Sequence, residues 1–146
     1  MGNIVERRTR GFTLIELLVI LVVLAVLAAI VLPKFAESGK RSKEAAVKAD
    51  LKLLRDAVDR FYADTGVWPV NLGQLALTTA PAKGIDANGD PAAINPSDWH
   101  GPYVDSVPKD ALAKSDYQYK TAAPAVGIVQ SSVTTKASDG TSPSTW

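Results

Sequence analysis

The most constraining feature of this sequence is an apolar run of 21 residues, Phe12 to Leu32, in which Glu16 is the only charged residue. As a helix rising about 1.5 Å per residue, the run extends about 31 Å, which matches a hydrocarbon core of roughly 30 Å. A carboxylate in that setting costs on the order of 2.5–3.5 kcal/mol on insertion scales, so it usually has a partner. The run offers Glu16 no partner, and we therefore expect one from another molecule, which indicates assembly.

The junction before this run adds a second constraint. Arg7, Arg8 and Arg10 precede Gly11, and Glu16 lies four residues after Phe12. Cleavage before Phe12 would create an ammonium group one helical turn from Glu16, at a helix end that already favours negative charge. In a stack of subunits, the amine of one chain would neutralise Glu16 of another. A misplaced subunit would leave a buried charge unpaired, so the pair would set the register.

Gly-Phe-Thr-Leu-Ile-Glu (residues 11–16), the apolar run and the break at Pro33 resemble the class III signal of type IV pilins and type II secretion pseudopilins. The resemblance implies cleavage after Gly11 by a prepilin peptidase, N-methylation of Phe12, and contact between Glu16 and the amino terminus of a neighbouring subunit in a filament. It also implies a fold with a long N-terminal helix on a small antiparallel sheet. The implied partners are further copies of the chain, the assembly platform and minor pilins.

Two plainer interpretations compete with this one. An ordinary secretory signal has an apolar stretch of about 7–15 residues, and Ala25, Ala28 and Ala29 would supply its cleavage site. This run is too long for that, and an acidic residue at its start is atypical. The other alternative is a single-pass, inner-membrane-anchored binding protein that does not polymerise. It explains the length of the run but neither Glu16 nor the Gly11–Phe12 junction.

Composition limits the remaining choices. The formal net charge of the 146-residue chain is +1, and removal of residues 1–11, with three Arg and one Glu, leaves 13 basic and 14 acidic residues. This balance gives no basic field for nucleic acid. Cysteine is absent, which excludes disulfides, metal-thiolate sites and cysteine nucleophiles. Major type IV pilins commonly close a C-terminal loop with cysteines, so their absence favours a pseudopilin or a pilin with another staple.

The charges around the run predict its orientation. The three arginines before it favour a cytoplasmic N-terminus, although Lys34, Lys40, Arg41 and Lys43 weaken the asymmetry. We expect a single-pass protein of the bacterial inner membrane that later enters a periplasmic or cell-surface filament.

The sequence predicts an α+β, pilin-like chain with four parts: a leader (1–11), a membrane-spanning and filament-core helix (12–33), an amphipathic helix (34–65) and a globular domain (66–146). Pro33 removes a helical hydrogen bond and predicts a kink. The helix resumes with an apolar stripe at spacings of four, three, four and three, and it should stop at Gly66. The stripe comprises Val47, Leu51, Leu54, Val58 and Phe61.

The globular domain reads as short elements between glycines and prolines. We expect a helical turn over Leu72–Leu77, loop over the rest of 78–98, and strands within 116–121 and 126–133. Asp139-Gly140 predicts a turn to a short terminal strand. Trp146 should dock on the sheet, the more ordinary choice, or contact a neighbouring molecule. Gly-Pro-Tyr (101–103) and Pro-Lys-Asp (108–110) resemble major pseudopilins. The Pro-Trp-Gly that often follows in that family is replaced by Ala111-Leu112-Ala113. Assignment to a surface pilus therefore stays possible beside the secretion pseudopilus.

No enzymatic pattern is present. The alternate oxygen ligands Asp86, Asn88 and Asp90 offer a calcium site, yet Pro91 replaces the EF-hand glycine and no suitable glutamate follows. Asp, Asn and Gly equally build a plain turn. The resemblance also implies calcium in a C-terminal loop, here near Ser138 and Asp139. His100 is the sole histidine and makes neither a triad nor a zinc site. We expect no other cofactor.

Overall fold

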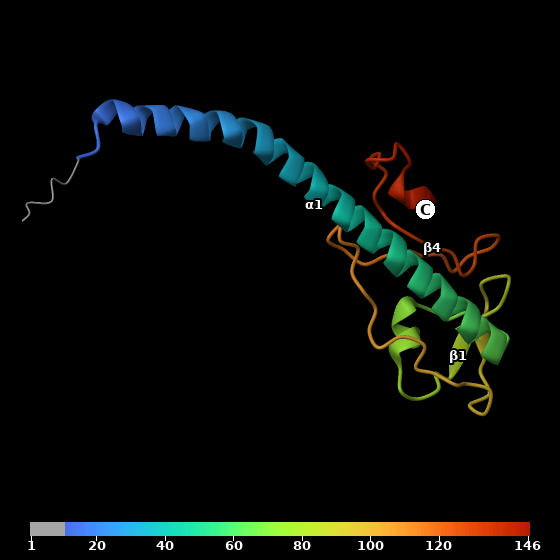
Figure 1. Ribbon diagram of the computed structural model, residues 1–146. Coiled ribbons are helices and arrows are strands. Elements are labelled where there is room, and N and C mark those ends of the chain that lie inside the picture. The colour runs from blue at the N-terminus through green and yellow to red at the C-terminus, as the bar shows by residue number, and fades with distance from the viewer. Residues whose placement is uncertain (1–10) are drawn as a thin grey trace, which may run out of the picture. The chain divides into compact units, whose positions relative to one another are not determined.

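The computed structural model describes residues 11–146, so the predicted leader lies outside the described residues except for Gly11. In the described part, one helix, α1 (Leu14–Thr65), is followed by two two-stranded antiparallel sheets and two short 3-10 helices, η1 (Leu72–Ala76) and η2 (Pro143–Thr145) (Figure 1). This arrangement confirms the α+β prediction of a long helix packed on small antiparallel sheets. The chain divides into two compact units, one ending at Gly39 and one spanning Lys40–Trp146.

The first unit is a helix with no core of its own. Every described residue up to Gly39 is exposed, which includes the whole apolar run. Within the described residues, α1 is the one helix long and apolar enough to cross a membrane. Its most apolar stretch is entirely unburied. Pro33 lies inside α1, which continues on both sides of it, and the predicted kink at that residue stays a prediction.

The second unit begins with the amphipathic part of α1. All five residues of the predicted stripe are buried, with at most 1% of each side chain exposed, so the stripe prediction is confirmed. The helix ends where expected, because Gly66 adopts a positive φ of 74° and its amide donates to the Tyr62 carbonyl. A glycine takes this left-handed conformation at a helix end without the steric penalty that a Cβ brings.

The core of the second unit forms between this stripe and the segments that follow α1. Phe61 contacts the Tyr103 ring with the centroids 5.5 Å apart, a separation typical of aromatic pairs. The helical turn η1 contributes Leu75, and Val129 comes from the C-terminal third; both are fully buried. The residues that pack here from beyond the helix are Leu72, Leu75, Ile94, Val104, Tyr117 and Val129.

The predicted loop over 78–98 is wrong. The segment contains an antiparallel hairpin of β1 (Lys83–Ile85) and β2 (Pro91–Ala93). Strands with Gly and Pro among three residues carry no alternating pattern, which explains the error. The hairpin is fastened by tertiary contact, since the Ile85 and Trp68 main chains exchange hydrogen bonds of 2.8 and 2.9 Å. Gly84 permits this approach, because a Cβ there would lie 2.6 Å from the Trp68 carbonyl oxygen.

The two predicted strands near the C-terminus are confirmed in place but are shorter. β3 (Gln118–Tyr119) pairs antiparallel with β4 (Val129–Gln130), and the pair forms a sheet separate from the first hairpin. The turn at Gly140 forms, with a φ of 81°. The short terminal strand predicted after it is wrong, because the segment folds as η2. Pro143 lacks the amide that a strand would need and starts a helical turn well.

The Pro-Lys-Asp segment forms a turn organised by a buried carboxylate. Asp110 is fully buried, and its Oδ1 accepts hydrogen bonds from the amides of Leu112 and Ala113 at 2.8 and 3.0 Å. Its Oδ2 accepts a 2.5 Å hydrogen bond from the Ser131 hydroxyl just after β4. Because buried polar atoms need partners, Asp110 ties this turn to the end of the second sheet.

Candidate functional site

The start of α1 forms a reciprocal cap around Glu16. The Thr13 amide and hydroxyl both donate to Glu16 Oε2, at 2.8 and 2.9 Å, and the Glu16 amide donates to Thr13 Oγ1 at 3.3 Å. This is the capping box of a Thr followed three residues later by Glu. The cap fixes the Glu16 carboxylate beside Phe12, the residue at the predicted cleavage junction.

This cap corrects one prediction. The apolar run was expected to offer Glu16 no partner, whereas Thr13 donates two hydrogen bonds to it. The Thr-x-x-Glu spacing was the signal that could have revealed them. Both donors are neutral, however, so the carboxylate still carries its charge without a counter-ion in the described residues.

The apolar run beside Glu16 is bare. Phe12 is 73% exposed, and Leu17 to Leu27 expose about half of each large side chain. Soluble monomers rarely expose a continuous apolar surface of this size, and such surfaces mark contact with a membrane or a protein. The structure thus places Gly11, Phe12 and Glu16 together at one end of an uncovered apolar rod.

On one flank of α1 in the second unit, two aspartates accept hydrogen bonds from tyrosines of the segments that follow the helix. Tyr117 donates to Asp50 at 3.0 Å, and Tyr103 donates to Asp64 at 2.8 Å. Burial raises the pKa of Tyr103 to about 12, and the hydrogen bond to Asp64 acts in the same direction. His100 lies beside this pair on a loop, as expected, with its Nδ1 3.7 Å from Asp64.

The other flank of α1 holds the C-terminal segment. Glu44 accepts hydrogen bonds from the Ser138 amide, at 2.9 Å, and from its hydroxyl, and these bonds lower the pKa of Glu44. Lys48 Nζ lies 2.7 Å from Asp139 Oδ2. Sequence reasoning missed Glu44 because it assigned this residue to a polar face. Its position three residues before Val47 continues the buried stripe.

Trp146 docks against α1, and the turn η2 just before it contacts β4 of the second sheet. The Lys48 ammonium lies 4.3 Å from the centre of its indole ring, a cation–π distance. Arg55 donates to the main-chain oxygens of Val129 and Trp146, and the indole donates to the Thr141 hydroxyl. Three helix side chains, Glu44, Lys48 and Arg55, therefore fasten the C-terminal segment without any cysteine.

The first candidate calcium ligands build the turn of the β1–β2 hairpin. Asp86 Oδ1 accepts hydrogen bonds from the amides of Asn88 and Asp90, at 2.8 and 2.9 Å. Those amides, together with the Gly89 amide, lower the pKa of Asp86, with Asp90 the largest contributor. A turn accounts for these three residues, and calcium binding by them stays a prediction.

The second candidate calcium position is filled by protein groups. Asp139 accepts from Lys48 on one oxygen, and from the Thr141 amide and hydroxyl on the other. Within residues 11–146, no three His, Cys, Asp or Glu residues are grouped in a way that could hold a metal ion. In this structure, the counter-ion of Asp139 is therefore the ammonium of Lys48.

Comparisons with known proteins agree with this geometry. Residues 7–32 match the prokaryotic N-terminal methylation motif, and residues 40–129 match the family described as PilW, C-terminal. The chain is 34% identical to type II secretion system core protein G of Klebsiella pneumoniae over 77% of its own length and 74% of that relative.

Further relatives extend the similarity to surface pili. The chain is 32% identical to core protein G of Vibrio cholerae, over 77% of this chain and 71% of the relative. It is 42% identical to the type IV major pilin protein PilA of Myxococcus xanthus, but only over 39% of this chain and 26% of that pilin. The comparison with solved structures gave no significant match. The chain belongs to the family of type IV pilins and type II secretion pseudopilins.

Proposed function

We propose that this chain is a structural subunit of a type II secretion pseudopilus or a type IV pilus-like filament, polymerised through its N-terminal helix. The observation that carries the proposal is the uncovered apolar run with a capped carboxylate at its start. Family membership supports it, because the methylation motif spans residues 7–32. Nothing in the described residues suggests an enzyme, and the relatives named above are filament or secretion-system proteins.

The driving force for assembly is burial of the apolar run. In the membrane, lipid chains cover this surface; outside it, only neighbouring copies of the helix can do so. Removal of apolar surface from water contributes roughly 25 cal/mol per Å², so a bare run of this length favours bundling strongly. The run from Phe12 to Leu32 is therefore the filament core in this proposal.

Glu16 sets the register in the same proposal. Its hydrogen bonds to Thr13 orient the carboxylate but leave the negative charge uncompensated. Inside an apolar filament core, an unpaired charge costs several kcal/mol, and the amine created at Phe12 of a neighbouring copy removes that cost. Only subunits stacked at one axial offset would satisfy this pair.

Family membership supports a proposal for processing, partners and location. The chain enters the bacterial inner membrane as a single-pass precursor with a cytoplasmic N-terminus, and a prepilin peptidase cleaves after Gly11 and methylates Phe12. An assembly platform and minor pilins then extract it into a periplasmic or cell-surface filament. The bare apolar helix and the matched methylation motif support this route.

Between the two filament types, the relatives favour the secretion pseudopilus. Core protein G of K. pneumoniae is matched over 74% of its length, whereas PilA of M. xanthus is matched over 26%. The absence of cysteine points the same way. Lys48 and Arg55 supply the fastening of the C-terminal segment that a disulfide provides in many pilins.

Mass spectrometry of the mature N-terminus tests the proposal against the rival membrane-anchored binding protein. In cells with an active prepilin peptidase, we expect a chain that starts at a methylated Phe12. An intact Met1, or a cut near Ala29, would contradict the proposal. Electron microscopy of cells that overproduce the chain should then show fibres, and the rival predicts none.

A further inference from the structure

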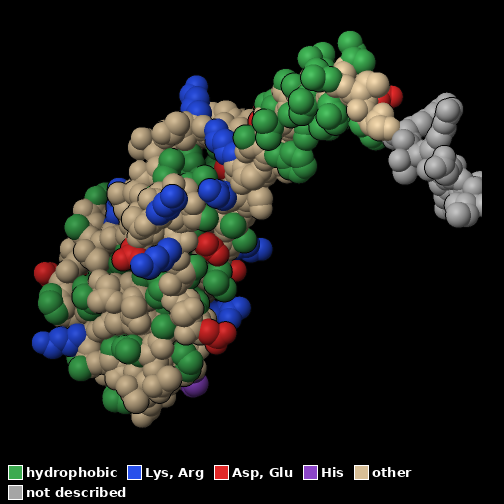
Figure 2. Space-filling model, turned by 90° about the vertical axis from the view of Figure 1, so that its left-hand side faces the viewer, with side chains coloured by type: hydrophobic (Ala, Val, Ile, Leu, Met, Phe, Trp, Pro, Cys, Tyr) green, Lys and Arg blue, Asp and Glu red, His purple; other side chains and the backbone are tan. Residues whose placement is uncertain are grey.

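The second unit carries its charges in an uneven pattern. Residues 40–55 contain six basic and two acidic side chains, whereas residues 56–116 contain four basic and nine acidic ones. Figure 2 shows several Lys and Arg side chains close together on one face of the molecule. Arg41, Lys48, Lys52 and Arg55 are spaced by seven, four and three residues, so they share one flank of α1.

Two of these four basic side chains, Arg41 and Lys52, have no partner among the described residues. Lys48 and Arg55 hold the C-terminal segment, as described above. Arg41 and Lys52 are exposed, and neither forms an ion pair or a side-chain hydrogen bond with any described residue. They lie eleven residues apart, three helical turns, and therefore point to the same side.

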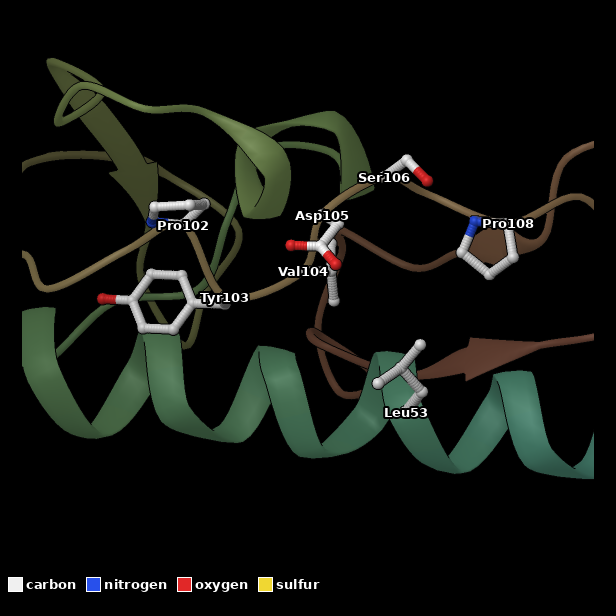
Figure 3. Close-up of a pocket in the computed structure, with 7 residues that line it drawn as sticks. All are labelled: Leu53, Pro102, Tyr103, Val104, Asp105, Ser106 and Pro108. Atoms are coloured by element: carbon white, nitrogen blue, oxygen red, sulfur yellow. The ribbon is translucent and has the colours of Figure 1, made fainter.

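The opposite flank carries an open groove of about 420 Å³ between α1 and the segment that follows Gly101. Figure 3 shows Leu53 projecting from the helix toward this segment, with Pro102 and Pro108 at the two ends of the groove. Leu53 is 49% exposed, although the adjacent Leu54 is fully buried. Apolar side chains such as Leu53, Pro102 and Pro108 thus line part of an open groove that no described part of the chain covers.

One carboxylate stands in this groove without a partner. Asp105 is exposed, lies between Tyr103 and Ser106 along the groove wall, and forms no ion pair or side-chain hydrogen bond with the described residues (Figure 3). Even Lys109, four residues away, does not pair with it. A groove that places apolar side chains beside one free carboxylate suits a long basic side chain, which packs its methylene stem and presents its charge at the tip.

We propose that this groove binds the basic flank of a second copy of the chain, with Lys52 of one subunit at Asp105 of the next and Arg41 close by. The inference rests on the proposed function, since it describes how the globular units of a filament pack. The opposite charges of the two flanks select this occupant over an uncharged partner.

The two surfaces lie on different flanks of one helix, which fixes the kind of assembly. A contact between different surfaces is heterologous, and when it does not close into a ring it repeats without limit as a helical filament. A contact of the groove with itself would bring two Asp105 carboxylates together and would be repelled. The charge pattern therefore favours a head-to-tail polymer over a symmetric dimer.

Cross-linking tests this contact cleanly because the chain has no cysteine. Filaments of the full chain with both Lys52→Cys and Asp105→Cys, treated with a short bismaleimide, should give a ladder of dimers, trimers and longer species. Filaments of either single variant, treated in the same way, should yield only monomers on a denaturing gel. Dimers from Asp105→Cys alone would overturn the proposal in favour of a symmetric contact, and a link to a different protein would overturn it in favour of another partner.

Charge reversal provides the second arm. Asp105→Lys or Lys52→Glu should lower filament yield about tenfold, and the two changes together should restore at least half of it. Asp98→Lys, an exposed aspartate outside the groove, is the matched control and should assemble normally. Unchanged unfolding midpoints would show that the variants fold.

The outcomes separate this proposal from the proposed function. Wild-type filaments that form normally, with no cross-link and no effect of Asp105→Lys beyond that of Asp98→Lys, would overturn only the contact. A correctly processed wild-type chain that forms no filament would overturn both.

Discussion

The two parts of α1 have opposite relations to the rest of the chain. From Lys40 onward, the helix is used on three sides: the apolar stripe enters the core, Asp50 and Asp64 hold tyrosines, and Lys48 and Arg55 hold the C-terminal segment. From Leu14 to Gly39, no residue is buried. The apolar surface of α1 is thus buried within the chain in one part of the helix and left uncovered in the other.

This difference shows where the driving force for each part arises. Burial of the stripe stabilises a single subunit, whereas burial of the apolar run requires lipid or other copies. Changes in the buried stripe should therefore act on folding, and changes in the apolar run should act on assembly while the subunit stays folded.

Glu16→Ala should reduce filament yield below detection while membrane insertion is unchanged. The substitution removes both the cap and the charge that sets register, and it makes the helix more apolar, so insertion should not suffer. Fibre counts by electron microscopy and the membrane-bound fraction after carbonate extraction would measure the two effects. Glu37→Ala, an exposed glutamate of the same helix outside the run, is the control and should assemble normally. Normal fibres from Glu16→Ala would remove the register role.

Two adjacent leucines probe the second part of the helix. Leu54 is fully buried and Leu53 is 49% exposed, so Leu54→Ala should lower the free energy of unfolding by about 2–5 kcal/mol. Leu53→Ala should change it by less than about 0.5 kcal/mol. Denaturant titration of the full chain in detergent would compare them. Equal losses for the two variants would mean that the groove beside Leu53 is closed in solution.

The sequence predicted the helical features well because they depend on local periodicity. The spacing from Val47 to Phe61 determines the buried stripe, and Gly66 provides the helix stop. The apolar run likewise needed no tertiary information. Burial of Glu44 was also within reach, because its spacing continues the stripe.

The failures concern elements whose only support is tertiary. The hairpin of β1 and β2 has three residues per strand and is held by Trp68, a contact that no periodicity reveals. Docking of Trp146 on α1 depends on Lys48 and Arg55, which lie about ninety residues earlier in the sequence. Sequence reasoning expected loop where the hairpin forms and docking of Trp146, but it had no means to find the partner of either segment.

Acid should loosen the C-terminal segment before it unfolds the helix. The hydrogen bond from Lys48 lowers the pKa of Asp139, and the bonds from Ser138 lower the pKa of Glu44. Carboxyls with a depressed folded pKa stabilise the native state above their ordinary values, 3.8 and 4.5, and lose this contribution as the pH falls through the folded pKa.

Hydrogen exchange of the amides of residues 137–141 would measure this loosening. Protection should fall as the pH drops below about 4, after correction for intrinsic exchange. Asp139→Asn should start with lower protection at neutral pH and show a smaller change in acid. Asp98→Asn, whose carboxylate has no hydrogen-bond partner in the described residues, should behave as wild type. A pH-independent segment would show that these carboxylates contribute nothing to its docking.

The smallest effect should come from the turn of the β1–β2 hairpin. Asp86→Ala removes the acceptor of two amides and should lower the thermal midpoint slightly, whereas Asp86→Asn keeps an acceptor oxygen and should lower it less. Addition of millimolar calcium separates the turn interpretation from the calcium interpretation, because a bound ion raises the midpoint of the protein that binds it. If Asp86, Asn88 and Asp90 only build a turn, calcium should not change the thermal unfolding midpoint of the wild type. A rise that disappears in Asp86→Ala would assign a calcium site to Asp86, Asn88 and Asp90, and it would make this hairpin a second region, after the apolar run, whose stability depends on a component from outside the chain.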